Sequence, residues 1–125
     1  MMEPLDCIRT ELDRMAYQPG IEGCALVEAT TGLLWYASGA GAQAERIWEA
    51  AVDYWRLYER QKDQFTVLGP LGAVAMHHIE GLLVVLPCCA DPDLLLILHG
   101  GHGCVDWTAL QRMTRALGRL VRNPG

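Results

Sequence analysis

The chain has 125 residues, of which 51% are hydrophobic and 20% charged, and its formal net charge is −5. This composition supplies a core for one small domain and excludes a disordered chain, while the acidic balance disfavours bulk binding to nucleic acid or anionic membrane. The longest apolar run, residues 82–90, is too short to cross a bilayer, and no signal-peptide pattern opens the chain. We therefore expect a soluble cytoplasmic protein without direct membrane insertion.

The first elements are predicted to be a helix and a hairpin. Apolar residues within 4–17 fall in an arc of about 100° at 100° per residue, which is typical of a helix lying on one surface. Residues 21–29 and 33–38 are short apolar runs separated by a turn that contains Gly32, and this pattern predicts a β-hairpin.

A longer helix is predicted over about 42–62. Its apolar side chains cover an arc of about 220° at 100° per residue, roughly twice what a surface helix needs. The excess is covered either by other parts of the same chain, for example its two other helices, or by a second subunit, and we favour the subunit. The candidate residues for a homodimer interface are Trp48, Tyr54, Trp55 and Leu57. The sequence does not say which edge of the helix faces outward.

From Phe65 onward the pattern changes to strands, predicted over 73–79, 82–88 and 94–99. A glycine-rich segment then leads to a last helix, which begins after an N-cap at Asp106 and ends near Arg122. The order helix, two strands, helix, three strands, helix predicts one α+β domain over 1–125. Its core is a five-stranded antiparallel sheet with helices packed on it.

The five cysteines have no disulfide-framework spacing, so we interpret them as reduced thiols that serve mainly as small core residues. They are Cys7, Cys24, Cys88, Cys89 and Cys104. Cys88 and Cys89 are neighbours in a predicted strand, so we expect their side chains to point to opposite faces.

The element order resembles that of the roadblock family, which is named after a dynein light chain. The resemblance lies in the first hairpin, IEGCALVEATTGLLWYAS, the later hairpin, HHIEGLLVVLPC with ADPDLLLILHGG, and the closing helix, WTALQRMTRALGRLV. Gly23, Gly32, Ala37 and Ser38 match a recurrent family pattern, whereas Thr31 stands where an acidic residue commonly precedes the turn glycine.

The resemblance implies a roadblock/longin/profilin-like fold and a homodimer in which the second helices pack together and the third strands pair edge to edge. It implies neither catalytic residues nor a cofactor. Bacterial and archaeal members of this family often accompany Ras-like GTPases, so the implied partner is a small GTPase or another protein.

Three kinds of chemical site compete with this interpretation. Potential zinc ligands occur in the C-terminal half, without CxxC or HExxH spacing: His77, His78, Cys88, Cys89, His99, His102 and Cys104. The segment 99–103 could cradle phosphate but lacks the lysine of a phosphate-binding loop. Ser38 has no nucleophile elbow, and Cys104 with His102 is the one local nucleophile–base pair. We predict that the protein is not an enzyme and holds no metal.

Basic residues are concentrated in the last helix. Residues 1–105 carry six basic and fourteen acidic groups, whereas residues 106–125 carry four basic groups and one acidic group. The four are Arg112, Arg115, Arg119 and Arg122, which fall within an arc of about 80° at 100° per residue. They either complement the helix dipole and keep the helix soluble, or form a partner-binding surface for an acidic protein.

The sequence thus predicts a non-enzymatic, dimeric scaffold or regulator of a small Ras-like GTPase or a related cytoplasmic assembly, with no nucleic-acid partner. The alternative is a small-ligand or metal-binding sensor domain that uses His and Cys residues of the C-terminal half.

Overall fold

The structure is a computed structural model that describes residues 4–39, 44–90, 92–101 and 105–122. Its elements are, in chain order, α1 (Pro4–Ala16), β1 (Ile21–Glu28), β2 (Leu34–Gly39), α2 (Ala44–Gln61), η1 (Lys62–Leu68), β3 (Val74–His77), β4 (Leu82–Ala90), β5 (Asp93–Gly100) and α3 (Trp107–Arg122). The strands form one antiparallel sheet in the order β2-β1-β5-β4-β3. The predicted α+β class, strand number and element order are confirmed.

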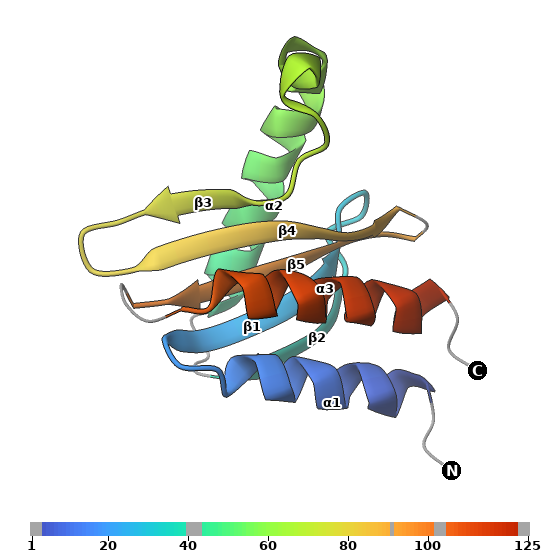
Figure 1. The fold of residues 1–125 in the computed structure, drawn as a ribbon, viewed down its shortest axis with the longest axis vertical. Helices are drawn as coiled ribbons and strands as arrows, with labels where there is room; N and C mark the ends of the chain where they lie inside the picture. Colours follow the sequence, from blue (N-terminus) through green and yellow to red (C-terminus); the bar gives the residue numbers. More distant parts are fainter. Residues whose placement is uncertain (1–3, 40–43, 91, 102–104, 123–125) are drawn as a thin grey trace.

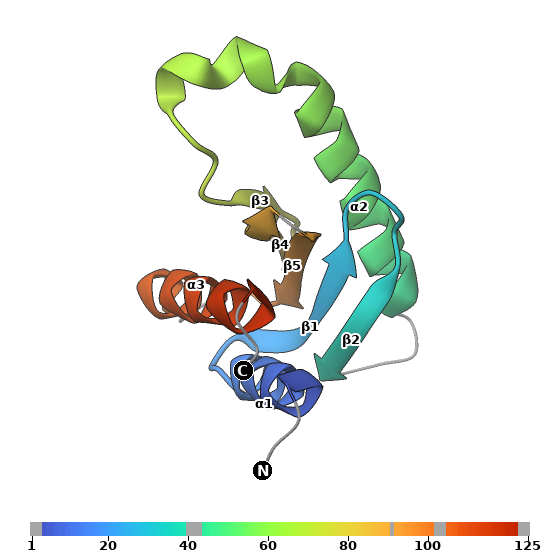
Figure 2. The same cartoon turned by 90° about the vertical axis from the view of Figure 1, so that its right-hand side faces the viewer.

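The sheet separates two layers of helix. Figures 1 and 2 show α1 and α3 side by side on one face and α2 alone on the other. The central strand β5 serves both layers, because successive side chains of a strand point to opposite faces. Leu94, Leu96 and Leu98 pack toward α1 and α3, while Leu95 and Ile97 pack toward α2. The near-continuous apolar run of this strand therefore reflects burial on both faces.

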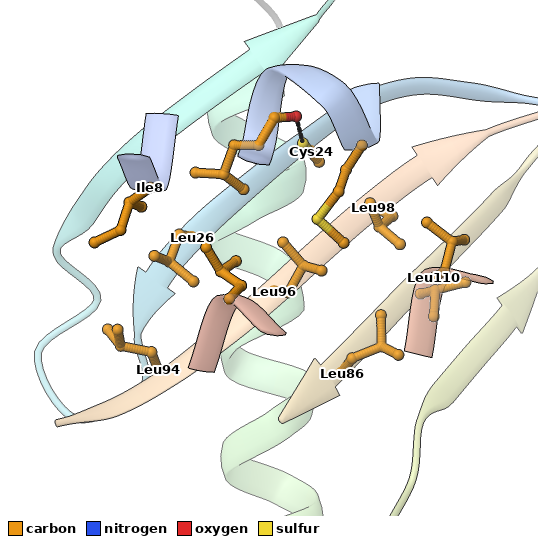
Figure 3. Packing of buried hydrophobic residues seen from close by; sticks show 12 residues of the cluster. Ile8, Cys24, Leu26, Leu86, Leu94, Leu96, Leu98 and Leu110 are labelled. Carbon is orange, nitrogen blue, oxygen red and sulfur yellow. Dashed lines mark hydrogen bonds between the residues drawn. The ribbon is translucent and has the colours of Figure 1, made fainter. Parts of the chain in front are cut away.

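The layer between the sheet and helices α1 and α3 is the larger of two apolar clusters. Figure 3 shows leucines of β1, β4 and β5 meeting Ile8 of α1 and Leu110 of α3. Cys24 lies in this cluster and its thiol donates to the carbonyl oxygen of Leu12 at 3.3 Å. Burial raises the pKa of the Cys24 thiol to about 12, with the Asp13 charge adding to the shift. This cysteine is a core residue, as the sequence predicts.

Local side-chain hydrogen bonds account for the start of α3 and for the position of α1. The carboxylate of Asp106 accepts a hydrogen bond from the backbone N–H of Ala109 at 2.9 Å, which confirms the predicted N-cap. On α1, one carboxylate oxygen of Asp13 accepts hydrogen bonds from Ser38 Oγ at 2.6 Å and from the Tyr36 hydroxyl at 3.3 Å. These bonds tie α1 to β2 and give Ser38 a structural role.

The segment after α2 differs from the prediction. Residues 62–68 form the 3₁₀-helix η1 instead of approaching strand conformation from Phe65, and every residue of η1 is exposed. Figure 2 shows α2 and η1 leading away from the sheet before the chain returns to β3. Phe65 stacks on Tyr58 of α2, with ring centroids 5.9 Å apart, so its apolar contact is made with a helix and not with a neighbouring strand.

The two adjacent cysteines of β4 also differ from the prediction. The pairing of β4 with β5 shifts register between Pro87 and Cys89, which marks a bulge. A bulge breaks the alternation of side chains, and both Cys88 and Cys89 pack against the cluster under α1 and α3. The expectation that they point to opposite faces is therefore wrong.

Candidate functional site

Helix α2 uses two of its predicted interface residues for its own core. Trp48 and Trp55 are only 5% and 6% exposed and pack with Ala51 and Val52 on the sheet. They lie two turns apart on one side of the helix, as a sheet-facing pair must. This corrects their assignment to the outer surface, because neither is accessible to a second subunit.

The other two predicted interface residues remain outside the core. Tyr54 and Leu57 are 53% and 47% exposed. Helices α1 and α3 lie on the opposite face of the sheet, so they do not cover this side of α2 (Figure 2). The chain's two other helices therefore do not fill the excess apolar arc.

A groove of about 770 Å³ shows which edge of α2 is left open. Its helix wall includes Ile47, Ala50 and Tyr54, and its other wall comes from the β3–β4 hairpin, including Met76 and Leu82. The open edge of α2 therefore faces β3. The sequence does not connect Ala50 with Met76, because only the packed sheet brings β3 next to α2.

Strand β3 ends the sheet on that same side. Its one neighbouring strand among the described residues is β4. The N–H of His78 donates to the carbonyl oxygen of Gly81, and the same register pairs Met76 with Leu83 and Val74 with Val85. Because hydrogen-bonded pairs alternate along an antiparallel ladder, Ala75 turns its N–H and C=O away from β4.

His99 closes one end of this groove beneath α2. Its ring lies 5.3 Å from that of Trp48, and its Nε2 is buried without a hydrogen-bond partner in the described part of the chain. Burial lowers the pKa of His99, and the Glu22 carboxylate, 3.9 Å from Nδ1, opposes that shift. A Cβ on Gly23 would lie 2.7 Å from Nε2, so the glycine makes room for the imidazole.

A second cavity, of about 640 Å³, lies between the end of α2, η1, the segment that leads into β3 and the end of β4. Trp55 and Tyr58 line it together with Phe65 of η1. Cys88 and Cys89 also border it, but burial raises the pKa of Cys88 to about 12 and also raises that of Cys89. Thiols held protonated in this way are poor nucleophiles and poor metal ligands.

The structure does not assemble the candidate metal ligands. His77, His78 and His99 border the groove, whereas Cys88 and Cys89 pack on the opposite face of the sheet. Among the described residues, no group of three or more His, Cys, Asp or Glu side chains could hold a metal ion. His102 and Cys104, and with them residues 102–103 of the glycine-rich segment 99–103, lie outside the described residues.

All four predicted partner-binding arginines are exposed on α3. The helix buries Leu110, Thr114, Leu117 and Gly118 toward the sheet and turns the arginines to another side. Arg115 borders a hollow of about 260 Å³ whose walls include Leu71 and Pro87. We call the four arginines the arginine stripe, and its member Arg115 lies on the side of α3 that faces the segment leading into β3.

Across the described residues, no helix is long and apolar enough to cross a membrane.

This chain is similar to known proteins in its three-dimensional structure. No protein-family model and no curated protein matches this sequence. A roadblock/LC7 domain from Streptomyces avermitilis matches with a TM-score of 0.72 and 20% identity, over 94% of this chain and 93% of that one. The gliding protein MglB from Thermus thermophilus matches with a TM-score of 0.78 and 14% identity, over 98% and 93%.

A structure described as MglB with tetrameric arrangement matches over the same shares, with a TM-score of 0.76 and 14% identity. These similarities extend over nearly the whole of each chain, so they concern the complete sheet and all three α-helices. This chain therefore has the roadblock/LC7 fold, which the order of its elements predicts.

Proposed function

We propose that this chain is a non-catalytic, homodimeric regulator or scaffold for a small Ras-like GTPase or a related cytoplasmic assembly. One observation carries the proposal: the exposed apolar edge of α2 and the outer edge of β3 border the same groove. Two incomplete surfaces on one side of a domain suit a single macromolecular partner.

A second copy of the chain fits both surfaces at once. A two-fold axis beside β3 pairs the outward N–H and C=O of Ala75 with the same strand of the other copy. The same axis brings the two α2 helices together through Tyr54 and Leu57, because a two-fold interface uses one patch on both subunits. The solved MglB with a tetrameric arrangement supports self-association in proteins of this fold.

The proposal that the partner is a small GTPase is supported by the resemblance to a family whose members often accompany such enzymes. The chemistry of the described residues suits a binding protein. Ser38 is hydrogen-bonded to Asp13, and the thiols of Cys24 and Cys88 are kept protonated by burial. None of these three groups is an activated nucleophile.

The dimer is tested by placing charges at the exposed edge of α2. We expect Tyr54→Glu combined with Leu57→Glu to weaken self-association by more than about a hundredfold, because two large side chains at the centre of an interface would be replaced by charges. Light scattering after size-exclusion chromatography measures the molar mass, and circular dichroism checks that the monomer stays folded.

Leu33→Glu combined with Leu34→Glu is the matched control. These leucines are also exposed, but they lie at the β1–β2 turn, next to the opposite edge of the sheet. The control should remain dimeric. A wild-type protein that is monomeric at tens of micromolar contradicts the proposal.

A further inference from the structure

The dipole of α3 explains only two of the four arginines in the arginine stripe. Arg119 and Arg122 lie in the last turn of α3, where the helix dipole favours positive charge. Arg112 and Arg115 lie earlier in the helix, beyond the reach of that effect. Successive members of the stripe are three or four residues apart, a spacing at which like charges repel. Among the described residues, none of the four forms an ion pair.

The surroundings of the stripe combine charge with an apolar recess. Arg115 and Gln111 stand at the hollow of about 260 Å³ between α3 and the chain that leads into β3. Its apolar walls include Leu71, Leu86 and Pro87. A partner bound here could pair carboxylates with the guanidinium groups and place one apolar side chain in the hollow.

We propose that the arginine stripe is the docking surface for an acidic segment of a partner protein, which lies along α3 with carboxylates one helical turn apart. Guanidinium groups bind carboxylates with two parallel hydrogen bonds, so a row of arginines recognises a row of acidic side chains. Charge complementarity favours a short segment over a long polyanion. Residues 1–105 hold six basic and fourteen acidic groups, so the rest of the molecule repels a nucleic acid or an anionic membrane.

The proposed dimer would double this surface, and this part of the inference rests on the proposed function. Figure 1 shows α3 on the β3 side of α1. Joining two sheets at β3 would place two arginine stripes on either side of the joint, on the face opposite α2. The trough between them would be basic on both walls and would suit one acidic segment per dimer.

The probe is a fluorescent amphipathic peptide of about 20 residues, long enough to form a helix, with glutamates one turn apart and leucines beside them. A second peptide has glutamine at every glutamate position. We expect the acidic peptide to bind the wild-type protein and to bind more weakly as salt is raised, while the glutamine peptide does not bind. Arg115→Glu combined with Arg119→Glu should weaken binding about tenfold or more and flatten its salt dependence.

Arg56→Glu combined with Arg60→Glu is the matched control, since it reverses the same number of charges on exposed residues of α2, across the sheet. It should keep binding within about twofold of the wild type. The proposal is overturned if the wild type does not bind the acidic peptide, if both peptides bind equally, or if both variants lose binding equally. Tighter binding of a DNA duplex, or of phosphatidylglycerol vesicles, than of the peptide also overturns it.

Light scattering on the same samples separates this inference from the proposed dimer. A monomeric wild type that binds the acidic peptide through the stripe would refute the dimer and keep the docking surface. A dimeric wild type that does not bind the acidic peptide would keep the dimer and refute the docking surface.

Discussion

Gly118 sets how closely α3 can lie on the sheet. A Cβ at this position would meet the backbone carbonyl oxygen of Cys88 well inside van der Waals contact. Alanine favours a helix interior over glycine by about 1 kcal/mol, but the obstacle here is backbone that cannot rotate away. We expect Gly118→Ala to lower the free energy of unfolding by about 1–2 kcal/mol net, measured by chemical denaturation at fixed protein concentration.

Gly101→Ala is the control, because a Cβ there meets no atom of the described residues within 4 Å. Its free energy of unfolding should change by less than about 0.5 kcal/mol. If Gly118→Ala is as stable as the wild type, α3 does not approach β4 as closely as the structure shows.

His99 is a titratable residue inside the layer between α2 and the sheet, and it makes stability depend on pH. Its pKa in the folded state is lowered by burial, with Glu22 opposing the shift. The imidazole therefore binds a proton more readily in the unfolded chain than in the folded one. The contribution of neutral His99 to the free energy of unfolding is present above the unfolded pKa of about 6.5, and it is lost as the pH falls through the folded pKa.

We therefore expect the free energy of unfolding to fall between about pH 7.5 and pH 5.5, and His99→Gln to reduce that slope. Denaturation at the two pH values measures it. An equal slope in wild type and His99→Gln would show that other groups cause the acid sensitivity.

The edge strand β3 allows the proposed dimer to be tested through the backbone instead of through side chains. Ala75→Pro removes an N–H that points away from β4, so no hydrogen bond within the sheet is lost. Proline on an edge strand blocks strand addition. We expect self-association to weaken by about tenfold or more, because one hydrogen-bonding group is lost from each subunit and the ring obstructs the joint.

Ala75→Val keeps the N–H and is the control, and light scattering with circular dichroism measures both variants. If Ala75→Pro dimerises as the wild type does, the subunits do not join through β3, and the interface consists of α2 alone.

Helix α2 shows how one amphipathic element is divided between two tasks. Its wide apolar arc contains a part that packs on the sheet, with Trp48 and Trp55, and an adjoining part that stays exposed, with Tyr54 and Leu57. The arc by itself indicates only that one sheet cannot cover the helix. The division follows from where the axis of α2 lies over the strands.

The two faces of the sheet are covered by different numbers of helices. Two helices pack on one face of the five-stranded sheet and a single helix packs on the other (Figure 2). The single helix leaves a groove toward β3, where Met76 and Leu82 are only partly buried. On the opposite face of the sheet, Arg115 of α3 borders the segment that leads into β3. Both proposed interactions therefore belong to the β3 side of the molecule.

The sequence by itself determined the parts of the structure that depend on local pattern. Helical periods, apolar runs and turn signals placed the helices and strands, and the short polar side chain of Asp106 set the start of α3. These signals act between residues that are close in the chain, so the sequence states them directly. Their order, together with the hairpin segments and Gly23, Gly32, Ala37 and Ser38, carries the resemblance to the roadblock family, and the structure has that fold.

Only the tertiary structure decided which side of each element meets which neighbour. It turned Trp48 and Trp55 inward, placed Tyr54 beside β3, and brought Cys88 and Cys89 to one face through a bulge. Periodicity locates an apolar side but cannot assign its partner, because that depends on layers formed by residues far apart in the chain. The bulge is likewise a property of the β4–β5 register, which only the packed sheet specifies.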